Sequence, residues 1–328
     1  MSTTTIAVIG AGFYGSYIAL KLADKGHKVI LIDPEQDDKN ATLHCQARLH
    51  SGMFYVRSIK DLVSCARNFT KFFKVFKPYV YSEFKFYYLI DKNSNVDFDS
   101  YKKICKETGL KTKEVKLDYV NSESVQGILE TNEFSINTSE LLSNLILQCK
   151  NHKNITFIKD YVSRITENGS EIKIDLTSND PIKVNKCILA SYGNNFTFLK
   201  DLGYTTLDFN HYKIPVIKYT DNLPKDCHAV VDGDFWSSIS LKDYKLLTNK
   251  FNLENTEDYW NKSLNLMKHY IPELEAELIQ IDTVEKYVLT NSREARITRF
   301  GNKNFQIYSV FSGKLTNIFD IINQIEEI

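Results

Sequence analysis

A glycine pattern near the start of the chain strongly limits the folds that this sequence can adopt. Four apolar residues are followed directly by Gly10-x-Gly12-x-x-Gly15, and a helical apolar pattern comes next. A second apolar run then ends at Asp33. This order of strand, glycine turn, helix, strand and acidic residue is typical of the βαβ unit that binds a dinucleotide. We therefore expect the first 33 residues to begin a Rossmann-like α/β domain.

The residues of this pattern have separate physical roles in a dinucleotide site. The first glycine allows a tight turn, the second lets a pyrophosphate approach the backbone, and the third lets the helix pack closely on the strand. The helix N-terminus at Phe13 and Tyr14 offers free N–H groups and a partial positive charge to the phosphates. Asp33 is placed to accept hydrogen bonds from a ribose 2′-hydroxyl, which argues against NADP. The pattern alone leaves NAD and FAD open.

The composition is that of a soluble globular protein with room for two domains. The chain has 328 residues, of which 43% are hydrophobic and 25% charged. Lys+Arg and Asp+Glu number 41 each, so no overall field favours nucleic acid. No apolar run approaches the roughly 18 residues of a membrane span, and the early strand leaves no room for a signal peptide. Scattered cysteines without a C-x-x-C pair argue against a zinc site, so we expect a cytoplasmic protein that acts on a small molecule without a metal.

The stretch from residue 46 to residue 58 combines polar, basic and aromatic side chains without a clean helical or strand period. It contains Arg48, His50, Tyr55 and Arg57. Structured loops of this content usually line a site. The alternative is a polar loop that ties two layers of the protein together. We treat the four side chains as candidate site residues.

The rest of the chain alternates between helical and strand patterns. We expect helices over 59–76 and 100–108, after an N-cap at Asn137, near 259–267 and at the C-terminus, and strands within 79–90, 155–165, 171–176, 186–190, 284–289 and 305–311. No internal repeat or low-complexity linker separates these elements. The pattern indicates two domains that are interleaved in the sequence.

On these motifs the sequence resembles the FAD-dependent oxidoreductases of the D-amino-acid-oxidase type, also called the glutathione-reductase-2 class. The glycine pattern with Asp33 matches the family's ADP-binding start, and residues 46–58 look like the segment beside the isoalloxazine ring. That segment is also similar to the H-x-G-x-Y-Y stretch of flavin-dependent 2-hydroxy-acid dehydrogenases. Residues 188–194 resemble a later motif near the ADP moiety, with one residue inserted between its alanine and its glycine, and residues 311–316 match the C-terminal flavin motif. Residues 232–236 resemble a substrate-domain strand of an uncharacterised bacterial subgroup.

The resemblance implies an α/β fold in which a Rossmann-like FAD-binding domain is interleaved with a sheet-rich α+β substrate domain. We place the FAD-binding domain at 1–76, 125–200 and 280–328, and the substrate domain at 77–124 and 201–279. The residues implied to contact FAD are Gly10, Gly12, Phe13, Tyr14, Gly15, Asp33, Gln46, Ala47, Arg48, Val162, Ser191, Tyr192, Gly313, Lys314, Leu315 and Thr316.

The resemblance also implies roles in catalysis. A flavin takes a hydride from the substrate at ring N5, and the protein supplies orientation and electrostatics. Lys314, at the start of the final helix, is the candidate cation beside the reduced ring. His50 is the candidate group that orients or deprotonates a substrate hydroxyl. Tyr55 and Trp236 are candidate pocket walls, with core packing as the alternative for either aromatic ring.

A carboxylate-bearing substrate requires a cation, preferably a bidentate arginine. Arg293, Arg296 and Arg299 cluster before the last strand, and their spacing of three along an extended segment prevents all of them from sharing one site. We choose Arg296 as the catalytic and substrate-binding anchor. Arg48 and Arg57 are the competing anchors.

The sequence therefore predicts an FAD-dependent oxidoreductase that oxidises a C–N or C–O bond of a small, carboxylate-bearing substrate, as amino acid and amine oxidases do. The electron acceptor is left unknown. The alternatives are a flavin-dependent 2-hydroxy-acid dehydrogenase, an NAD-dependent dehydrogenase, and a flavin-binding protein without catalysis. NAD is disfavoured because segments 46–58 and 312–316 would then be unexplained.

Overall fold

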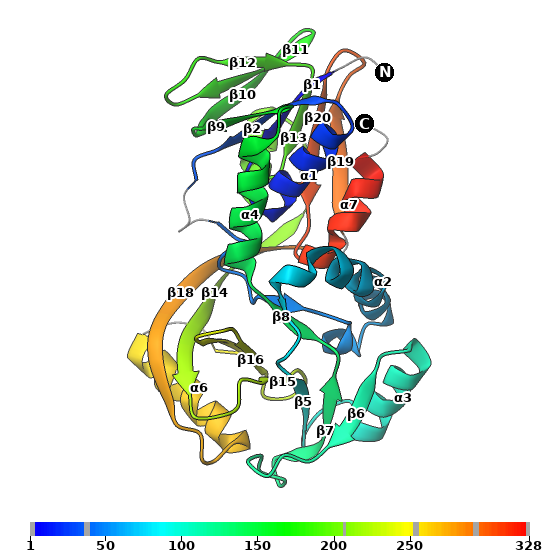
Figure 1. Cartoon of the computed structure of the whole chain (residues 1–328), viewed down its shortest axis with the longest axis vertical. Coiled ribbons are helices and arrows are strands. Elements are labelled where there is room, and N and C mark those ends of the chain that lie inside the picture. The colour runs from blue at the N-terminus through cyan, green and yellow to red at the C-terminus, as the bar shows by residue number, and fades with distance from the viewer. Residues whose placement is uncertain (1–3, 36–39, 206–207, 252–255, 291–294, 326–328) are drawn as a thin grey trace. The chain divides into compact units, whose positions relative to one another are not determined.

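The chain folds into two units that alternate along the sequence (Figure 1). The computed structural model describes residues 4–35, 40–205, 208–251, 256–290 and 295–325. The first unit comprises Met1–Leu43, Thr138–Tyr212 and Lys286–Ile328, and the second comprises His44–Asn137 and Lys213–Glu285. The elements of each unit therefore come from separate stretches of the chain.

A six-stranded, mostly parallel sheet forms the centre of the first unit. Its strands are β1 (Thr5–Ile9), β2 (Lys28–Asp33), β9 (Ile155–Lys159), β13 (Lys186–Leu189), β19 (Arg296–Gly301) and β20 (Gln306–Phe311). They lie in the order β19-β20-β13-β1-β2-β9. The first pair is antiparallel and the remaining neighbours are parallel. The apolar run of β1 is explained by this place, because a central parallel strand is covered on both faces.

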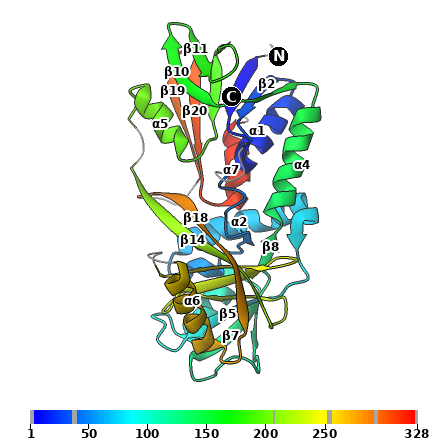
Figure 2. The ribbon, with the colours of Figure 1, turned by 90° about the vertical axis from the view of Figure 1, so that its left-hand side faces the viewer.

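Helices cover one face of this sheet, and a second small sheet covers much of the other (Figure 2). The first face carries α1 (Phe13–Asp24), α4 (Thr138–Asn151), the short helix η4 (Leu315–Asn317) and α7 (Ile318–Ile325). The second face carries α5 (Asn194–Asp201) and the strands β10 (Val162–Asn168), β11 (Glu171–Leu176) and β12 (Ile182–Val184). Ile9, Ile174 and Ile307 belong to one buried apolar cluster, so the small sheet packs on the central one.

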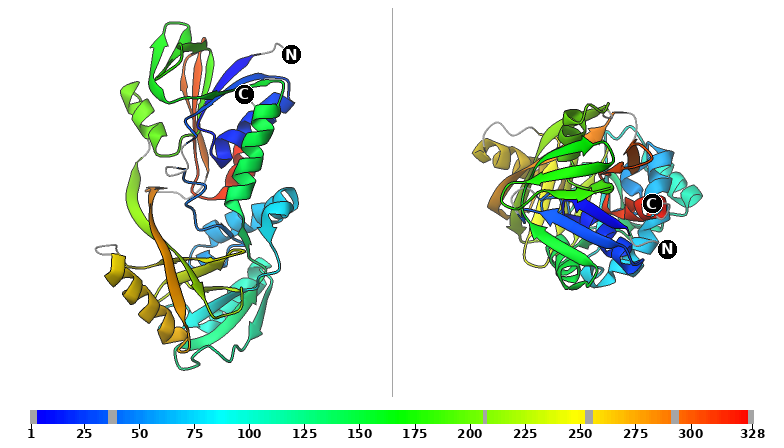
Figure 3. Two further views of the ribbon diagram at one scale, coloured as in Figure 1. Left: turned by 60° about the vertical axis from the view of Figure 1, so that its left-hand side comes forward. Right: turned by 90° about the horizontal axis from the view of Figure 1, so that it is seen from above.

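The second unit is built on an eight-stranded sheet. Its strands are β5 (Phe86–Asp91), β6 (Thr112–Val115), β7 (Val125–Thr131), β14 (Phe209–Asp221), β15 (Cys227–Val230), β16 (Trp236–Ser240), β17 (Lys245–Asn249) and β18 (Ala276–Leu289). They lie in the order β18-β14-β17-β16-β15-β5-β7-β6. Figure 3 shows the long neighbouring strands β14 and β18, beside which helix α6 (Thr256–Tyr270) lies. Residues of this helix pack with Trp236 and Tyr219 in one apolar core.

A small sheet and three helical segments complete the second unit. The strands are β3 (Arg48–Leu49), β8 (Phe134–Ile136) and β4 (Val80–Tyr81), and β8 pairs with both of the others. The helices are α2 (Ile59–Phe76) and α3 (Phe98–Thr108), with short helical turns η2 (Met53–Tyr55) and η3 (Lys77–Tyr79). The Ser58 side chain caps α2 by accepting a hydrogen bond from the Asp61 N–H.

The predicted fold class is confirmed, but the unit boundaries differ from the predicted domain boundaries. Residues 44–76 and 125–137, predicted to lie in the FAD-binding domain, belong to the second unit. Strand pairing is the physical reason, because β3 pairs with β8 and β7 pairs with β5. The sequence also predicted too short a strand at 284–289, since β18 begins at Ala276.

Candidate functional site

The carboxyl ends of the parallel strands in the first unit bring several predicted residues to one edge of the sheet. Ile9 pairs with Ile32 and Leu189, so the turns after β1, β2 and β13 begin side by side. Strand β19 runs the other way, and its first residue, Arg296, pairs with Phe311 at the end of β20. Ligands of open α/β sheets bind at such an edge.

Two of the three motif glycines are required by the fold itself. Gly10 has a φ of +98°, and a Cβ on it would lie 2.7 Å from the Ala190 carbonyl oxygen. A Cβ on Gly15 would lie 1.8 Å from the Gly10 carbonyl oxygen, so helix α1 could not pack this closely on β1.

Gly12 is different, because neither space nor strain in the protein explains it. Its φ is −62°, and the nearest atom to an added Cβ is Thr42 Oγ1 at an ordinary 3.5 Å. It also precedes helix α1 without giving that helix a side-chain cap. A glycine here leaves the helix N-terminus accessible to a ligand that approaches the backbone, as the pyrophosphate of FAD does.

Asp33, at the end of β2, is held by two backbone groups. Its Oδ2 accepts a hydrogen bond from the Ala11 N–H at 2.7 Å, and its Oδ1 accepts one from the Glu35 N–H at 2.7 Å. The carboxylate therefore has a fixed place beside the glycine turn. Val162, another predicted contact, begins β10 two residues after Asp160, whose N–H donates to the Asp33 carbonyl oxygen.

Thr42 and Asn40 are site residues that the sequence reasoning missed. Thr42 Oγ1 accepts a hydrogen bond from the N–H of Phe13, the first residue of α1, at 3.1 Å. Asn40 Oδ1 in turn accepts from the Thr42 N–H at 3.0 Å. A hydroxyl on the helix N-terminus lies where an anion would be bound. The available signal was a hydroxyl residue in the polar turn after Asp33.

A buried asparagine organises the turn that follows β13. Asn195 Oδ1 accepts hydrogen bonds from the Ser191 N–H at 2.9 Å and the Ser191 hydroxyl at 2.8 Å. Its Nδ2 donates to the carbonyl oxygens of Leu189 at 3.0 Å and Val310 at 2.8 Å. One neutral side chain thus joins the ends of β13 and β20 to this turn.

The residue inserted in the same turn, Tyr192, adopts a left-handed backbone with a φ of +55°. Its hydroxyl accepts a hydrogen bond from the Tyr287 N–H at 3.0 Å, and its ring stacks on Phe311 with centroids 5.6 Å apart. A non-glycine residue in this region is strained, and such strain is often found at functional sites.

The C-terminal motif forms the turn between β20 and the final helix. An added Cβ on Gly313 would meet no atom of the described residues within 4 Å. Lys314 precedes η4, which contains Leu315 and the buried Thr316, and its carbonyl oxygen accepts a hydrogen bond from the Tyr14 hydroxyl at 2.5 Å. Burial raises the pKa of Tyr14, so this phenol stays a donor. The buried Asn317 amide has no hydrogen-bond partner among the residues that the structure describes, which leaves polar atoms at this helix start that a cofactor could satisfy.

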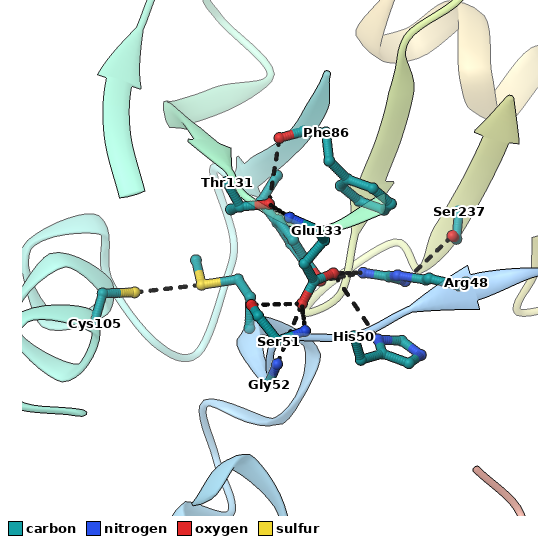
Figure 4. Close-up of polar contacts among 11 residues, drawn as sticks. Arg48, His50, Ser51, Gly52, Phe86, Cys105, Thr131, Glu133 and Ser237 are labelled. Carbon is teal, nitrogen blue, oxygen red and sulfur yellow. Dashed lines mark hydrogen bonds and ion pairs between the residues drawn. The ribbon is translucent and has the colours of Figure 1, made fainter. Parts of the chain in front are cut away.

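The other predicted residues belong to the second unit, where Arg48 and His50 lie beside a buried carboxylate (Figure 4). Glu133 follows β7 and is fully buried. Its Oε2 is 3.1 Å from Arg48 Nη2, and the Tyr88 hydroxyl donates to the same oxygen at 2.6 Å. Its Oε1 accepts from the Ser51 N–H at 2.8 Å. The Arg48 charge is therefore neutralised inside the unit, which sequence reasoning did not foresee.

His50 lies next to this carboxylate, with Nδ1 3.9 Å from Glu133 Oε2. Its side chain is 17% exposed, and its ring contacts Tyr55 with centroids 6.0 Å apart. Arg57 pairs with Asp232 at 3.2 Å. The structure thus brings His50, Tyr55 and Arg48 together, with the two arginines each paired to an acid.

Three further predicted residues of the second unit differ in their surroundings. The Gln46 Nε2 donates to Thr248 Oγ1 at 3.1 Å, and Ala47 has a left-handed φ of +51° before β3. Trp236, predicted as a substrate residue, is 1% exposed and belongs to the apolar core with α6. That prediction is not supported, because a substrate could reach this ring only by opening the core. Arg293 lies outside the described residues.

The glycine turn, the acid after the second strand and the C-terminal helix start are features typical of a dinucleotide-binding edge. A family model for FAD dependent oxidoreductases, DAO, matches residues 5–214. The chain belongs to this FAD-dependent oxidoreductase family, and FAD is its cofactor, as the sequence predicted. No curated protein sequence matches the chain.

Solved structures share the whole fold at low sequence identity. Glycine oxidase from Geobacillus kaustophilus has a TM-score of 0.79 and 11% identity, over 99% of this chain and 95% of that chain. L-proline dehydrogenase from P. horikoshii has a TM-score of 0.72 and 14% identity, over 98% and 91%. L-alpha-glycerophosphate oxidase from Mycoplasma pneumoniae, with FAD bound, has a TM-score of 0.75 and 14% identity, over 99% and 94%. At these identities the likeness establishes the fold.

Within the described ranges, no helix is long and apolar enough to cross a membrane. No group of three or more His, Cys, Asp or Glu side chains in that part of the chain could hold a metal ion.

Proposed function

We propose that this FAD-dependent oxidoreductase oxidises the C–N bond of a small amine or amino acid that carries a carboxylate. The observation that carries the proposal is Arg296, an exposed guanidinium at the nucleotide edge with no hydrogen bond or ion pair in the described residues. It pairs across the sheet with Phe311, the first residue of the C-terminal flavin motif. Arg48 and Arg57 have acidic partners, so Arg296 is the arginine best suited to bind a carboxylate.

The cofactor residues follow from the same edge. In the proposal, the α1 N-terminus with Gly12 and Thr42 receives the pyrophosphate, and Asp33 accepts a hydrogen bond from the ribose. Carboxylate oxygens accept more than one hydrogen bond each, so the contacts with backbone N–H groups are compatible with this role. The Gly313–Lys314 turn and the start of η4 supply N–H groups and an ammonium to the pyrimidine side of the flavin.

The chain's own residues then orient and deprotonate the substrate. Bound FAD supplies the chemistry by accepting a hydride from the substrate carbon. Arg296 would bind the carboxylate through two N–H donors, which fixes the substrate's orientation. His50 would accept or donate a proton at the substrate nitrogen or oxygen. An amine that is already neutral needs no such base, so His50 matters most for a protonated amine or a hydroxyl.

A second candidate is a flavin-dependent 2-hydroxy-acid dehydrogenase. The motif of His50, Gly52 and Tyr55 favours it, because a histidine beside a hydroxyl is the base that C–O oxidation requires. Among proteins of this fold, both glycine oxidase and glycerophosphate oxidase occur. The fold is therefore compatible with either bond.

The test is anaerobic reduction of the purified holoprotein by a panel of small molecules. Glycine, sarcosine, proline and larger amino acids form one arm, and 2-hydroxy acids form the other. Bleaching of the flavin absorbance by an amine and not by its hydroxy analogue supports the proposal. Bleaching by a hydroxy acid alone favours the second candidate, and no bleaching by either arm overturns both.

A further inference from the structure

The geometry of the second unit points to a residue that acts behind His50. We propose that Glu133 is a positioning residue, which holds the turn carrying His50 in the orientation that the reaction requires. The inference rests on the proposed function, because it takes His50 as the group that touches the substrate. Glu133 itself contacts neither the cofactor nor the substrate in this proposal.

The two oxygens of Glu133 bind two different parts of the site (Figure 4). Oε1 accepts hydrogen bonds from the N–H and the hydroxyl of Ser51, at 2.8 and 3.0 Å, and from the Gly52 N–H at 3.3 Å. Oε2 accepts from Arg48 Nη2 at 3.1 Å and from the Tyr88 hydroxyl at 2.6 Å. Charge-assisted hydrogen bonds of this kind are stronger than neutral ones.

These contacts fix the backbone on both sides of His50. Leu49, before it, pairs with Phe134, the residue that follows Glu133. Ser51, after it, is bound by the Glu133 carboxylate. The segment between β7 and β8 that carries Glu133 therefore holds the histidine in place through its two chain neighbours.

The ring of His50 is also restricted. Its Nδ1 atom is buried and lies 3.9 Å from Glu133 Oε2. The rings of Phe54 and Tyr55 lie beside it, with centroids 5.6 and 6.0 Å away. Since Nδ1 is buried, the exposed part of the side chain is the rest of the ring, which can face a reacting molecule.

A glutamine cannot replace this carboxylate. One end of its amide is an NH2 donor, which would face either the N–H groups of the turn or the guanidinium of Arg48. Both alternatives place donor against donor. A buried ion pair contributes little net stability compared with apolar residues, so geometry is the better explanation for retaining one here.

The experiment uses holoprotein variants and compares Glu133→Gln with Asp221→Asn. Asp221 is the matched control, because its carboxylate is equally buried and pairs with Lys245 at 2.9 Å in the same unit, apart from the His50 turn. We expect Glu133→Gln to keep the flavin spectrum, to lower kcat about 100-fold and to change KM less than threefold, as a misplaced group does. Asp221→Asn is expected to keep kcat within about twofold. Equal losses of kcat in the two variants, or an unchanged kcat in Glu133→Gln, overturn the inference.

A double variant decides whether Glu133 acts through His50. In a His50→Ala background, Glu133→Gln is expected to lower kcat no further, because the group that it positions is already absent. Multiplication of the two effects overturns the inference. If Glu133→Gln does not fold, Glu133→Asp keeps the charge, withdraws the carboxylate by one methylene, and is expected to act in the same direction.

A substrate-independent measurement separates this inference from the proposed function. Diethylpyrocarbonate modifies exposed imidazole rings, and mass spectrometry reports the rate at His50 alone. We expect Glu133→Gln to change this rate several-fold and Asp221→Asn to leave it unchanged. If the wild-type flavin is reduced by no substrate, the proposed function fails, while an unchanged modification rate is what overturns the positioning role.

Discussion

The nucleotide edge of the first unit and the His50 turn of the second are both held by a buried polar hub, but the hubs differ in charge. In the first unit the amide of Asn195 joins the ends of β13 and β20 to the turn at Ser191. In the second unit the carboxylate of Glu133 joins Arg48 to the turn at Ser51. The same task is done by a neutral group in one place and by an ion pair in the other.

The difference extends to the buried side chains of the two units. Among the described residues, the buried acidic and basic side chains of the second unit are Arg48, Asp91, Glu133, Asp221, His228, Asp232 and Lys245, against Asp160 in the first. An edge that binds an anionic cofactor through backbone N–H groups is best served by neutral supports, because a buried carboxylate beside it would repel the phosphates. The second unit has no such restriction, and its charges make it the more sensitive to pH and to neutralising substitutions.

The largest effect is expected from Gly15→Ala, set against Gly12→Ala. The Cβ of the first would lie 1.8 Å from the Gly10 carbonyl oxygen, so α1 must move and the free energy of unfolding should fall by about 3 kcal/mol or more. The Cβ of the second has ordinary contacts, so the fold should persist while FAD is lost. Thermal melting and the flavin-to-protein absorbance ratio measure the two effects. Gly12→Ala with one FAD per chain would show that no phosphate approaches this glycine.

The next effect is expected from removing one charge of the second hub. Glu133→Ala leaves the Arg48 guanidinium buried without its counter-charge and should lower the free energy of unfolding by about 3–5 kcal/mol. Asn195→Ala, in the neutral hub, should cost about 1–3 kcal/mol, because it leaves uncharged groups unpaired. Urea denaturation measures both. An equal cost in the two hubs would refute the comparison.

The ion pair between Arg48 and Glu133 is also where prediction from the sequence reached its limit. Local patterns predicted α2 over 59–76 and the glycine turn, because periodicity and backbone space are properties of short stretches. They also identified Arg48 as a residue of a site-lining segment. They could not reveal its partner, because Glu133 is 85 residues away and meets it only through the pairing of β3 with β8. The same reason explains why the unit boundaries differ from the predicted domain boundaries and why the burial of Trp236 was not foreseen.

The cofactor side shows the same division between local and distant information. The roles of Gly10 and Gly15 in the turn followed from the motif, and the family match supports FAD. Thr42 was missed because its contact with the Phe13 N–H depends on how the turn after β2 folds back over α1. Asn195 was missed because its four partners come from three separate elements.

Acid should weaken the second unit before the first. Burial, followed by the nearby charge of Lys245, lowers the pKa of His228 to about 3, whereas an unfolded histidine titrates near 6.5. The unfolded state therefore binds more protons between these values, and stability falls as the pH is lowered through this window. The loss should reach about 2 kcal/mol at pH 5, at about 1.4 kcal/mol per pH unit. In the first unit, burial and the nearby Lys186 and Lys25 also lower the pKa of His27, but this ring is only partly buried, so the larger loss is expected in the second unit. Hydrogen bonds outweigh burial and lower the pKa of Asp160, whose contribution to stability is lost only below its ordinary value near 4.

Hydrogen exchange at pH 7 and pH 5 tests this order. Amides of β15 and β16 should lose protection at pH 5 while those of β1 and β13 keep theirs. A His228→Gln variant removes the titrating group and should show a smaller difference between the two pH values. Equal loss of protection in both units would contradict the assignment of acid sensitivity to the second unit.

A smaller effect, confined to the substrate, is expected from Arg296→Ala. Loss of a charged, bidentate hydrogen-bond donor should raise KM for a carboxylate substrate by about 10- to 100-fold while the flavin spectrum stays normal. Arg299→Ala is the matched control, because Arg299 is also exposed but is an odd number of residues away on β19 and points to the other face. Steady-state kinetics with the substrate found in the reduction panel gives both values. An equal rise in KM for the two variants would remove Arg296 as the anchor.

The smallest effect is expected from Asp33→Ala, which tests the exception to the neutral character of the nucleotide edge. Asp33 is a carboxylate at this edge, and its oxygens accept hydrogen bonds from the Ala11 and Glu35 N–H groups. It lies at the end of β2, whereas the phosphates are proposed to bind at the α1 N-terminus. A negative group is favourable there because its ligand would be a hydroxyl donor. Its loss should weaken FAD binding by about 1–3 kcal/mol. This is less than the cost expected for breaking the buried ion pair of Glu133, because water can solvate the ribose hydroxyl. Titration of the apoprotein with FAD measures the change, and unaltered affinity would mean that Asp33 supports the glycine turn and does not bind the ribose.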